Sequence, residues 1–261
     1  MLIILPPSES KRPPAAAGHP VDVGALSFPE LTPTRLQIAE ALVKTSAGLD
    51  AFRRLFVRPS IAPEVAANTH LFDLPAMRAI DLYTGPLYEG LGATGLSSVA
   101  AARADDVLMI NSALWGALRP SDKVPPYRMH VCAHLLGMES LEPIWRRELP
   151  DVFAEGAGES GVIVDTRSPT YRATGSPAGM GDRTVVVKVA LGPPGQRIGD
   201  VIAKRVRGEA ARLLLEGGAD PEGPPELASV LADRWPVHLD PPERDGHPWT
   251  LTLDPSATIR T

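Results

Sequence analysis

Short apolar runs alternate with amphipathic stretches along this chain. The apolar runs at residues 2–5, 107–111 and 161–165 are bounded by polar residues or glycine, a pattern typical of buried strands. Three further segments alternate or run apolar at strand spacing: residues 128–134, 183–191 and 249–253. The segment at residues 81–88 fits neither pattern. Buried strands separated by long connections indicate a largely parallel sheet.

Helices are predicted in the connections, at residues 30–45, 50–56, 63–69, 141–149 with the segment after it, and 197–216. The last is the clearest, because its apolar residues recur three and four positions apart and form one stripe: Ile198, Val201, Ile202, Val206, Ala210, Leu213 and Leu214. Strands interleaved with helices predict an α/β fold, and the hairpin-like later strands make its central sheet mixed. We expect a single compact domain over residues 1–261.

The bulk composition narrows the classes of function. The 31 acidic residues exceed the 26 basic ones and give a net charge of −5, so the chain lacks the global basic charge of a nucleic-acid binder, although a local basic face stays open. No apolar run approaches the length that spans a bilayer, so no membrane partner is expected. The single cysteine allows no internal disulfide, which favours a reducing cytoplasm.

Polar side chains follow the first predicted strand directly. Ser8, Glu9, Ser10 and Lys11 come after residues 2–5, and clefts in α/β sheets form outside the carboxyl ends of strands. These residues therefore are candidates for a binding site. The alternative is that the two serines only cap the loop backbone.

A second polar loop follows the strand at residues 107–111. It carries six candidate ligand-binding residues: Asn111, Ser112, Arg119, Asp122, Tyr127 and Arg128. Two arginines nine residues apart could hold one anion from two sides, because a guanidinium matches carboxylate or phosphate. The alternative is an internal pair between Arg119 and Asp122.

A third candidate cluster, Asp165 with Arg167, follows the strand at residues 161–165. If these strand ends are parallel, both residues converge with the two earlier loops on one pocket for a polar, anionic or nucleobase-like ligand. Glu9 and Asp165 are then the candidate catalytic carboxylates. An internal ion pair between Asp165 and Arg167 is the alternative.

Five segments together resemble the bacterial peroxide-stress family YaaA, also called UPF0246. Residues 112–128 resemble its signature S-x-L-Y-G-x-L-R-P-x-D-x-x-x-x-Y-R, with Trp115 in place of the tyrosine. Residues 1–11 resemble its opening strand and loop, and residues 165–171 resemble its L-x-S-x-x-Y segment. The motif G-x-x-Y-x-G-L brings Tyr88, and K-x-x-R-G on a helix brings Lys204 and Arg207, into the candidate ligand-binding set. The alternative for the last two is a solvated helix face.

The resemblance implies a compact α/β fold and a cytoplasmic role in limiting peroxide damage by keeping unincorporated iron low. It also implies DNA binding by a helix-hairpin-helix in the N-terminal third. The corresponding residues 55–64 contain no glycine, which such a hairpin normally uses to bring backbone N–H groups to a phosphate. Arg53, Arg54 and Arg58 are the phosphate-contact candidates that the chain offers there.

A departure from the family lies at His130, Cys132 and His134, where family members usually have a sequence closer to L-x-M-G. On a strand these three side chains would share one face at spacings of about 6–7 Å, and they are ligand types for a metal ion or a haem iron. The alternatives are a lone redox thiol or a buried, inert cysteine at Cys132.

Two hypotheses from different classes remain. The first is the family function, with DNA and iron as partners. The second is an enzyme that reuses the fold for a small polar or nucleobase-like substrate, with Glu9, Asp165 or a cofactor at His130 and Cys132 supplying the chemistry.

Overall fold

The computed structural model describes residues 1–190 and 198–257. Its strands are β1 (Leu2–Leu5), β2 (Met77–Arg78), β3 (Leu108–Ser112), β4 (Gly116–Leu118), β5 (Lys123–Val124), β6 (Ile163–Asp165), β7 (Thr184–Val189), β8 (Val237–Asp240) and β9 (Trp249–Leu253). Seven of them form one mixed sheet in the order β4-β3-β1-β6-β7-β9-β8. The strands from β3 to β9 in this order are parallel, and the edge strands β4 and β8 are antiparallel to their neighbours. The predicted α/β class with a mixed sheet is confirmed.

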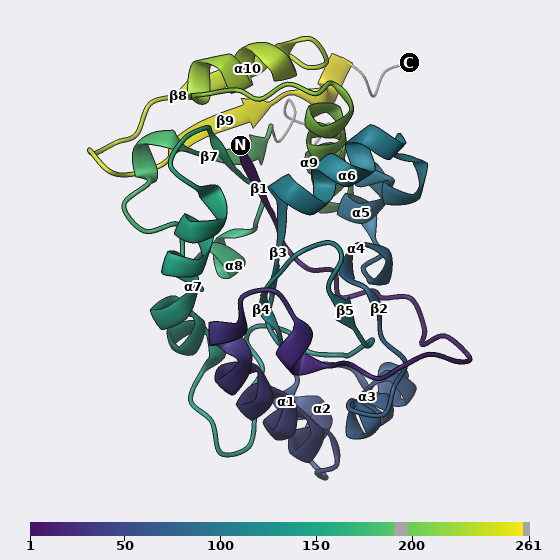
Figure 1. The fold of residues 1–261 in the computed structure, drawn as a ribbon. Helices are drawn as coiled ribbons and strands as arrows, with labels where there is room; N and C mark the ends of the chain where they lie inside the picture. The colour runs from purple at the N-terminus through teal and green to yellow at the C-terminus, as the bar shows by residue number, and fades with distance from the viewer. Residues whose placement is uncertain (191–197, 258–261) are drawn as a thin grey trace.

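The described helices are α1 (Thr32–Ser46), α2 (Ala51–Arg54), α3 (Ala62–Ala67), α4 (Ala79–Leu82), α5 (Pro86–Leu91), α6 (Ser98–Val107), α7 (Leu141–Ala157), α8 (Pro169–Arg172), α9 (Asp200–Glu216) and α10 (Pro224–Ala232). Figure 1 shows α7 and α8 on one side of the sheet and α5, α6 and α9 on the other. The central strands are completely buried between these layers: every residue of β1 and β3 is inaccessible to solvent. No helix in residues 1–190 or 198–257 is long and apolar enough to cross a membrane.

Helices α5 and α9 cross at two glycines. A Cβ atom on Gly208 would lie 1.9 Å from the Leu87 carbonyl oxygen, and one on Gly90 would lie 2.1 Å from the Arg205 carbonyl oxygen. Only glycine leaves room for backbones to approach this closely. The contact fixes α9 against α5 and so places the cations of α9.

The predicted elements agree with the structure except in a few places. The ambiguous segment at residues 81–88 contributes to two short helices, α4 and α5. The last residue of the predicted strand 183–191 and the first of the predicted helix 197–216 lie outside the described residues. Within that helix, Val206, Ala210 and Leu214 are buried as predicted, whereas Val201 and Ile202 are exposed.

The prediction of a strand at residues 128–134 is wrong, because this segment is an extended loop with a turn. Its apolar alternation is real: Met129, Val131 and Ala133 are buried while the residues between them face outward. Its backbone, however, bonds to other partners than a strand. The Arg128 N–H donates to the Asn68 side chain, and the His134 N–H donates to the Arg54 carbonyl oxygen.

Candidate ligand-binding site

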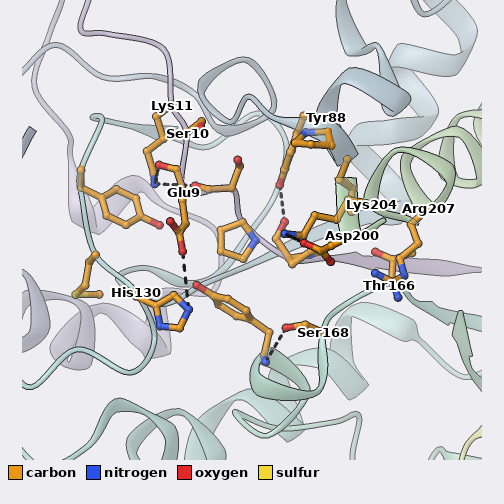
Figure 2. Close-up of a pocket in the computed structure, with 18 residues that line it drawn as sticks. Glu9, Ser10, Lys11, Tyr88, His130, Thr166, Ser168, Asp200, Lys204 and Arg207 are labelled. Atoms are coloured by element: carbon orange, nitrogen blue, oxygen red, sulfur yellow. Dashed lines mark hydrogen bonds and ion pairs between the residues drawn. The ribbon is translucent and has the colours of Figure 1, made fainter. Parts of the chain in front are cut away.

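A cavity of about 420 Å³ opens where β1 and β6 end. The chain leaves β1 toward its neighbour β3 and leaves β6 toward β7 on the opposite side, so a crevice forms between the two carboxyl ends. Figure 2 shows Glu9, Ser10 and Lys11 on one side of this cavity and Asp200, Lys204 and Arg207 on the other. Two separate elements thus bring cations to one hollow.

The side-chain amine of Lys11 contacts a backbone carbonyl oxygen and an aromatic ring. Its Nζ donates to the Ser8 carbonyl oxygen at 2.8 Å and lies 4.1 Å from the centre of the Tyr127 ring. Burial is the main cause that lowers the pKa of Lys11 to about 7, and the positive charge of Arg128 adds to it, while Glu9 and Glu64 oppose it. The neutral amine of Lys11 is therefore abundant near neutral pH.

A layer of hydroxyl groups lies beside Lys11. The Tyr127 hydroxyl is 3.0 Å from that of Tyr83 and 2.8 Å from Ser112 Oγ, and the Tyr88 hydroxyl donates to the Pro6 carbonyl oxygen at 2.9 Å. Burial raises the pKa of Tyr127 to about 12 and that of Tyr83 and Tyr88 well above the ordinary value. These tyrosines stay protonated and can donate hydrogen bonds at physiological pH.

The rim of the cavity carries an acid, a base and a guanidinium. Glu9 Oε2 accepts from Arg128 Nη2 at 2.8 Å, and Glu9 Oε1 lies 4.0 Å from His130 Nε2. His130 Nδ1 accepts a hydrogen bond from the Cys132 N–H, which assigns the proton of the neutral ring to Nε2, on the side of Glu9. The charges of Glu9 and Arg128 thus offset each other at this rim, and Glu9 is the exposed member of the pair.

The opposite wall comes from α9. Lys204 Nζ pairs with Asp200 at 2.6 Å one helical turn earlier, and Arg207 Nε donates to the Val187 carbonyl oxygen at 3.2 Å. Burial is the main cause that lowers the pKa of Arg207, although the group remains charged. Within the described residues this is the one hydrogen bond of the Arg207 guanidinium, so its other N–H groups are available to an anion.

Asp165 and Arg167 lie beneath the cavity and do not line it. Both are buried, and Arg167 also donates to Asn111 Oδ1 and to the Gly175 carbonyl oxygen, each at 2.9 Å. Ser112 likewise acts from below, through Tyr127. The internal ion pair that was the alternative for Asp165 and Arg167 is the arrangement found, and the pair supports the floor of the site.

Arg119 and Asp122 lie away from the cavity. Strand β4 folds back antiparallel to β3, so Arg119 emerges at the amino-terminal end of β3 and donates to the Asp106 and Leu108 carbonyl oxygens. Asp122 accepts from the Arg119 N–H at 2.7 Å and from Ser27. The predicted grip of Arg119 and Arg128 on one anion is therefore wrong, because Arg119 is held beside the start of β3 whereas Arg128 pairs with Glu9.

His130, Cys132 and His134 do not share a strand face, because their segment is a loop. Only His130 lines the cavity, Cys132 borders a neighbouring hollow, and the His134 ring meets Phe56 edge-on at 5.1 Å. The parts of the chain that the structure describes contain no group of three His, Cys, Asp or Glu side chains placed to hold a metal ion. The predicted ligand set assumed a strand, and this loop does not bring the three side chains onto one face.

Residues 55–64, which correspond to the family's hairpin and contain no glycine, include one residue in a backbone conformation that favours glycine. Phe56, between α2 and the 3₁₀ helix Pro59–Ile61, has φ 55°, the left-handed conformation that usually requires glycine. Arg53 and Arg54 both pair with Asp50. Arg58 is exposed beside them.

Four polar lining residues were absent from the predicted site residues: Thr166, Ser168, Tyr171 and Asp200. The first three directly follow β6, so the strand-end argument that selected Asp165 and Arg167 also covers them. Asp200 is the first residue of α9, one turn before Lys204, and this pairing was readable from the helical spacing.

The fold and the site define an α/β protein with a polar cavity at the carboxyl ends of its central parallel strands. Residues 1–235 match the family described as peroxide stress protein YaaA, and the chain belongs to this family. It is 37% identical over 257 residues to a UPF0246 protein of Streptomyces coelicolor, covering 97% of this chain and 98% of that one. A UPF0246 protein of Corynebacterium efficiens is 36% identical over 88% of this chain and 91% of its own length.

Proposed function

We propose that this protein acts in the cytoplasmic response to peroxide, where it limits iron-driven damage by binding a small anionic or nucleobase-like ligand in the cavity between β1 and β6. The family match supports the peroxide role. The observation that supports a bound ligand is that Lys11, Lys204 and Arg207, from two distant segments, line one cavity of about 420 Å³.

The walls of the cavity favour a small ligand over a macromolecule that would bind to a flat surface. Lys11 lies against the buried ring of Tyr127, and Arg207 is partly buried, so both attract a charge more strongly than they would in bulk water. Leu87, Pro86 and Met129 add apolar wall, and a few convergent polar groups in such walls are the usual composition of a small-molecule site.

Peroxide survival of a strain that lacks the gene tests the proposal. Wild-type protein and the Arg205→Gln variant should restore survival, whereas Arg207→Gln should not. Arg205 is a matched control, because it lies two residues away on α9 and pairs with Glu89 outside the cavity. Full rescue by Arg207→Gln at equal protein level would contradict a role for the cavity.

DNA is a second candidate partner, favoured by the left-handed backbone of Phe56, which gives this hairpin the turn that its sequence lacks. Fluorescence anisotropy with a duplex tests it over a salt series, because each lost phosphate contact lowers the salt slope by about one. Arg58→Gln should weaken binding, whereas Arg53→Gln, which removes a cation already paired with Asp50, should change it less. Equal binding by wild type and Arg58→Gln would reject this surface.

A further inference from the structure

We propose that Lys11 is a nucleophilic lysine that forms an imine with a small aldehyde or ketone bearing a carboxylate or phosphate, the anionic group being held by Arg207 and Lys204. This inference deepens the proposed ligand site and rests on it. It assigns the cavity a class of substrate and a covalent step.

The first support is the set of partners around the Lys11 amine. Within the described residues its hydrogen bonds go to backbone carbonyl oxygens, those of Ser8 and Glu9, and no carboxylate lies within ion-pair distance. The carboxylate of Glu9 instead pairs with Arg128. A partly buried lysine beside another cation is the usual environment of an amine that reacts as a nucleophile at neutral pH, and its pKa of about 7 agrees.

The second support is a set of proton carriers around the amine. The Tyr127 ring lies against Lys11 Nζ, and its hydroxyl continues to Tyr83 and Ser112. His130 lines the same cavity with its Nε2 toward Glu9. Imine formation needs such groups, because a carbonyl oxygen must gain two protons before it leaves as water.

The third support is the position of the anion-binding wall. Figure 2 shows Lys204 and Arg207 across the cavity from Lys11. A ligand whose anionic end binds at α9 would direct its other end toward β1, where Lys11 lies. Anion-binding residues on one wall and a fixed nucleophile on the other would orient a short molecule that carries both an anionic group and a carbonyl group.

The proposed step balances without an oxidant or reductant. The Nζ lone pair attacks the carbonyl carbon, the C=O π electrons move to oxygen, and a carbinolamine forms after one N–H proton is passed to that oxygen. The second N–H proton leaves nitrogen as the C–O bond breaks, so the products are a C=N bond and one water. His130 is placed to relay these protons.

Reductive trapping of the full-length protein tests the step. Glyoxylate and glyceraldehyde 3-phosphate represent the carboxylate and phosphate arms, neutral glycolaldehyde is the control, and cyanoborohydride at pH 7 reduces any imine. Peptide mass mapping should place the adduct on Lys11 at least about tenfold above any other lysine, because a lysine with a pKa near 7 is far more deprotonated than an ordinary one. The exposed Lys44, Lys123 and Lys188, which lie outside the cavity, serve as internal controls.

Two variants test the nucleophile and the anion-binding residue separately. Lys11→Arg keeps the charge and should abolish the adduct, and Arg207→Gln should lower labelling by the two anionic aldehydes about tenfold while leaving glycolaldehyde unchanged. The mapping on wild-type protein needs no variant, so a misfolded variant does not remove the test. Labelling spread evenly over the five lysines would overturn the proposal.

Calorimetry with glycolate 2-phosphate, which has no aldehyde or ketone, tests the proposed anion site separately from the proposed imine step. Binding that Arg207→Gln weakens, together with no adduct on Lys11, would overturn the imine step and keep the anion site. Neither binding nor adduct would overturn both.

Discussion

Arg167 holds Asp165 by two parallel hydrogen bonds, from Nε to Oδ1 at 3.0 Å and from Nη2 to Oδ2 at 2.7 Å, with both side chains essentially inaccessible to solvent. A third bond, from the Arg167 N–H to Oδ1, closes the turn after β6. With its oxygens occupied, Asp165 is a structural carboxylate that does not line the cavity, whereas the carboxylates of Glu9 and Asp200 do.

Removing one member of this pair should be costly. Arg167→Met leaves Asp165 buried without its partner, and we expect the free energy of unfolding to fall by about 3–5 kcal/mol in urea denaturation. The double variant Asp165→Leu/Arg167→Met should recover most of the loss, since no unpaired charge remains. A single variant within about 1 kcal/mol of wild type would show that the site is hydrated.

Stability should depend on pH through Lys11. Its pKa is about 7 in the folded chain and 10.5 in the unfolded chain, so between these values the unfolded state binds more protons and stability rises with pH. The free energy of unfolding of wild type relative to Lys11→Met should increase by up to about 1.4 kcal/mol per pH unit from pH 7 to 9.5. A flat difference over this window would mean that Lys11 is well solvated.

Two arginines that the sequence treated alike should behave differently. Arg207→Gln should weaken binding of glycolate 2-phosphate, because Arg207 lines the cavity, whereas Arg119→Gln should leave binding unchanged. Arg119→Gln should instead lower the melting temperature, since it removes bonds to two carbonyl oxygens. Loss of binding in the Arg119 variant without loss of stability would contradict the hairpin placement.

The crossing of α5 and α9 predicts a steep cost for one methyl group. Gly208→Ala must separate the two helices and should destabilise the fold by about 3 kcal/mol. Gly199→Ala is the control, because no described residue lies within 4 Å of its added Cβ, and, at the N-cap of α9, it should change stability by no more than about 1 kcal/mol. Thermal melts of both variants decide it, and equal melting temperatures would refute the close approach.

The sequence predicted the centre of the fold well, because β1, β3 and β6 are apolar runs that are buried on both faces and have no other stable environment. It also predicted that the loops after β1 and β6 meet, which follows from parallel pairing.

Two of the errors share one origin, the path of the chain after β3. A strand as short as β4 leaves no periodicity to detect, yet its reversal carries Arg119 back to the amino-terminal end of β3. Residues 128–134 alternate like a strand because they lie over the core, and only the partners of their N–H groups reveal a loop. Side-chain periodicity reports burial, whereas the backbone partner is set by segments distant in sequence.

The position of β1 has a consequence for biosynthesis. Strand β1 leaves the ribosome before both of its partners, β3, more than a hundred residues later, and β6, later still. Until those partners emerge, an apolar segment with open edges must wait unpaired, a condition that slows folding and favours association between nascent chains. The Lys11 loop is attached to this strand, so a truncated chain that ends before β6 would lack the opposing strand end and could not complete the cavity.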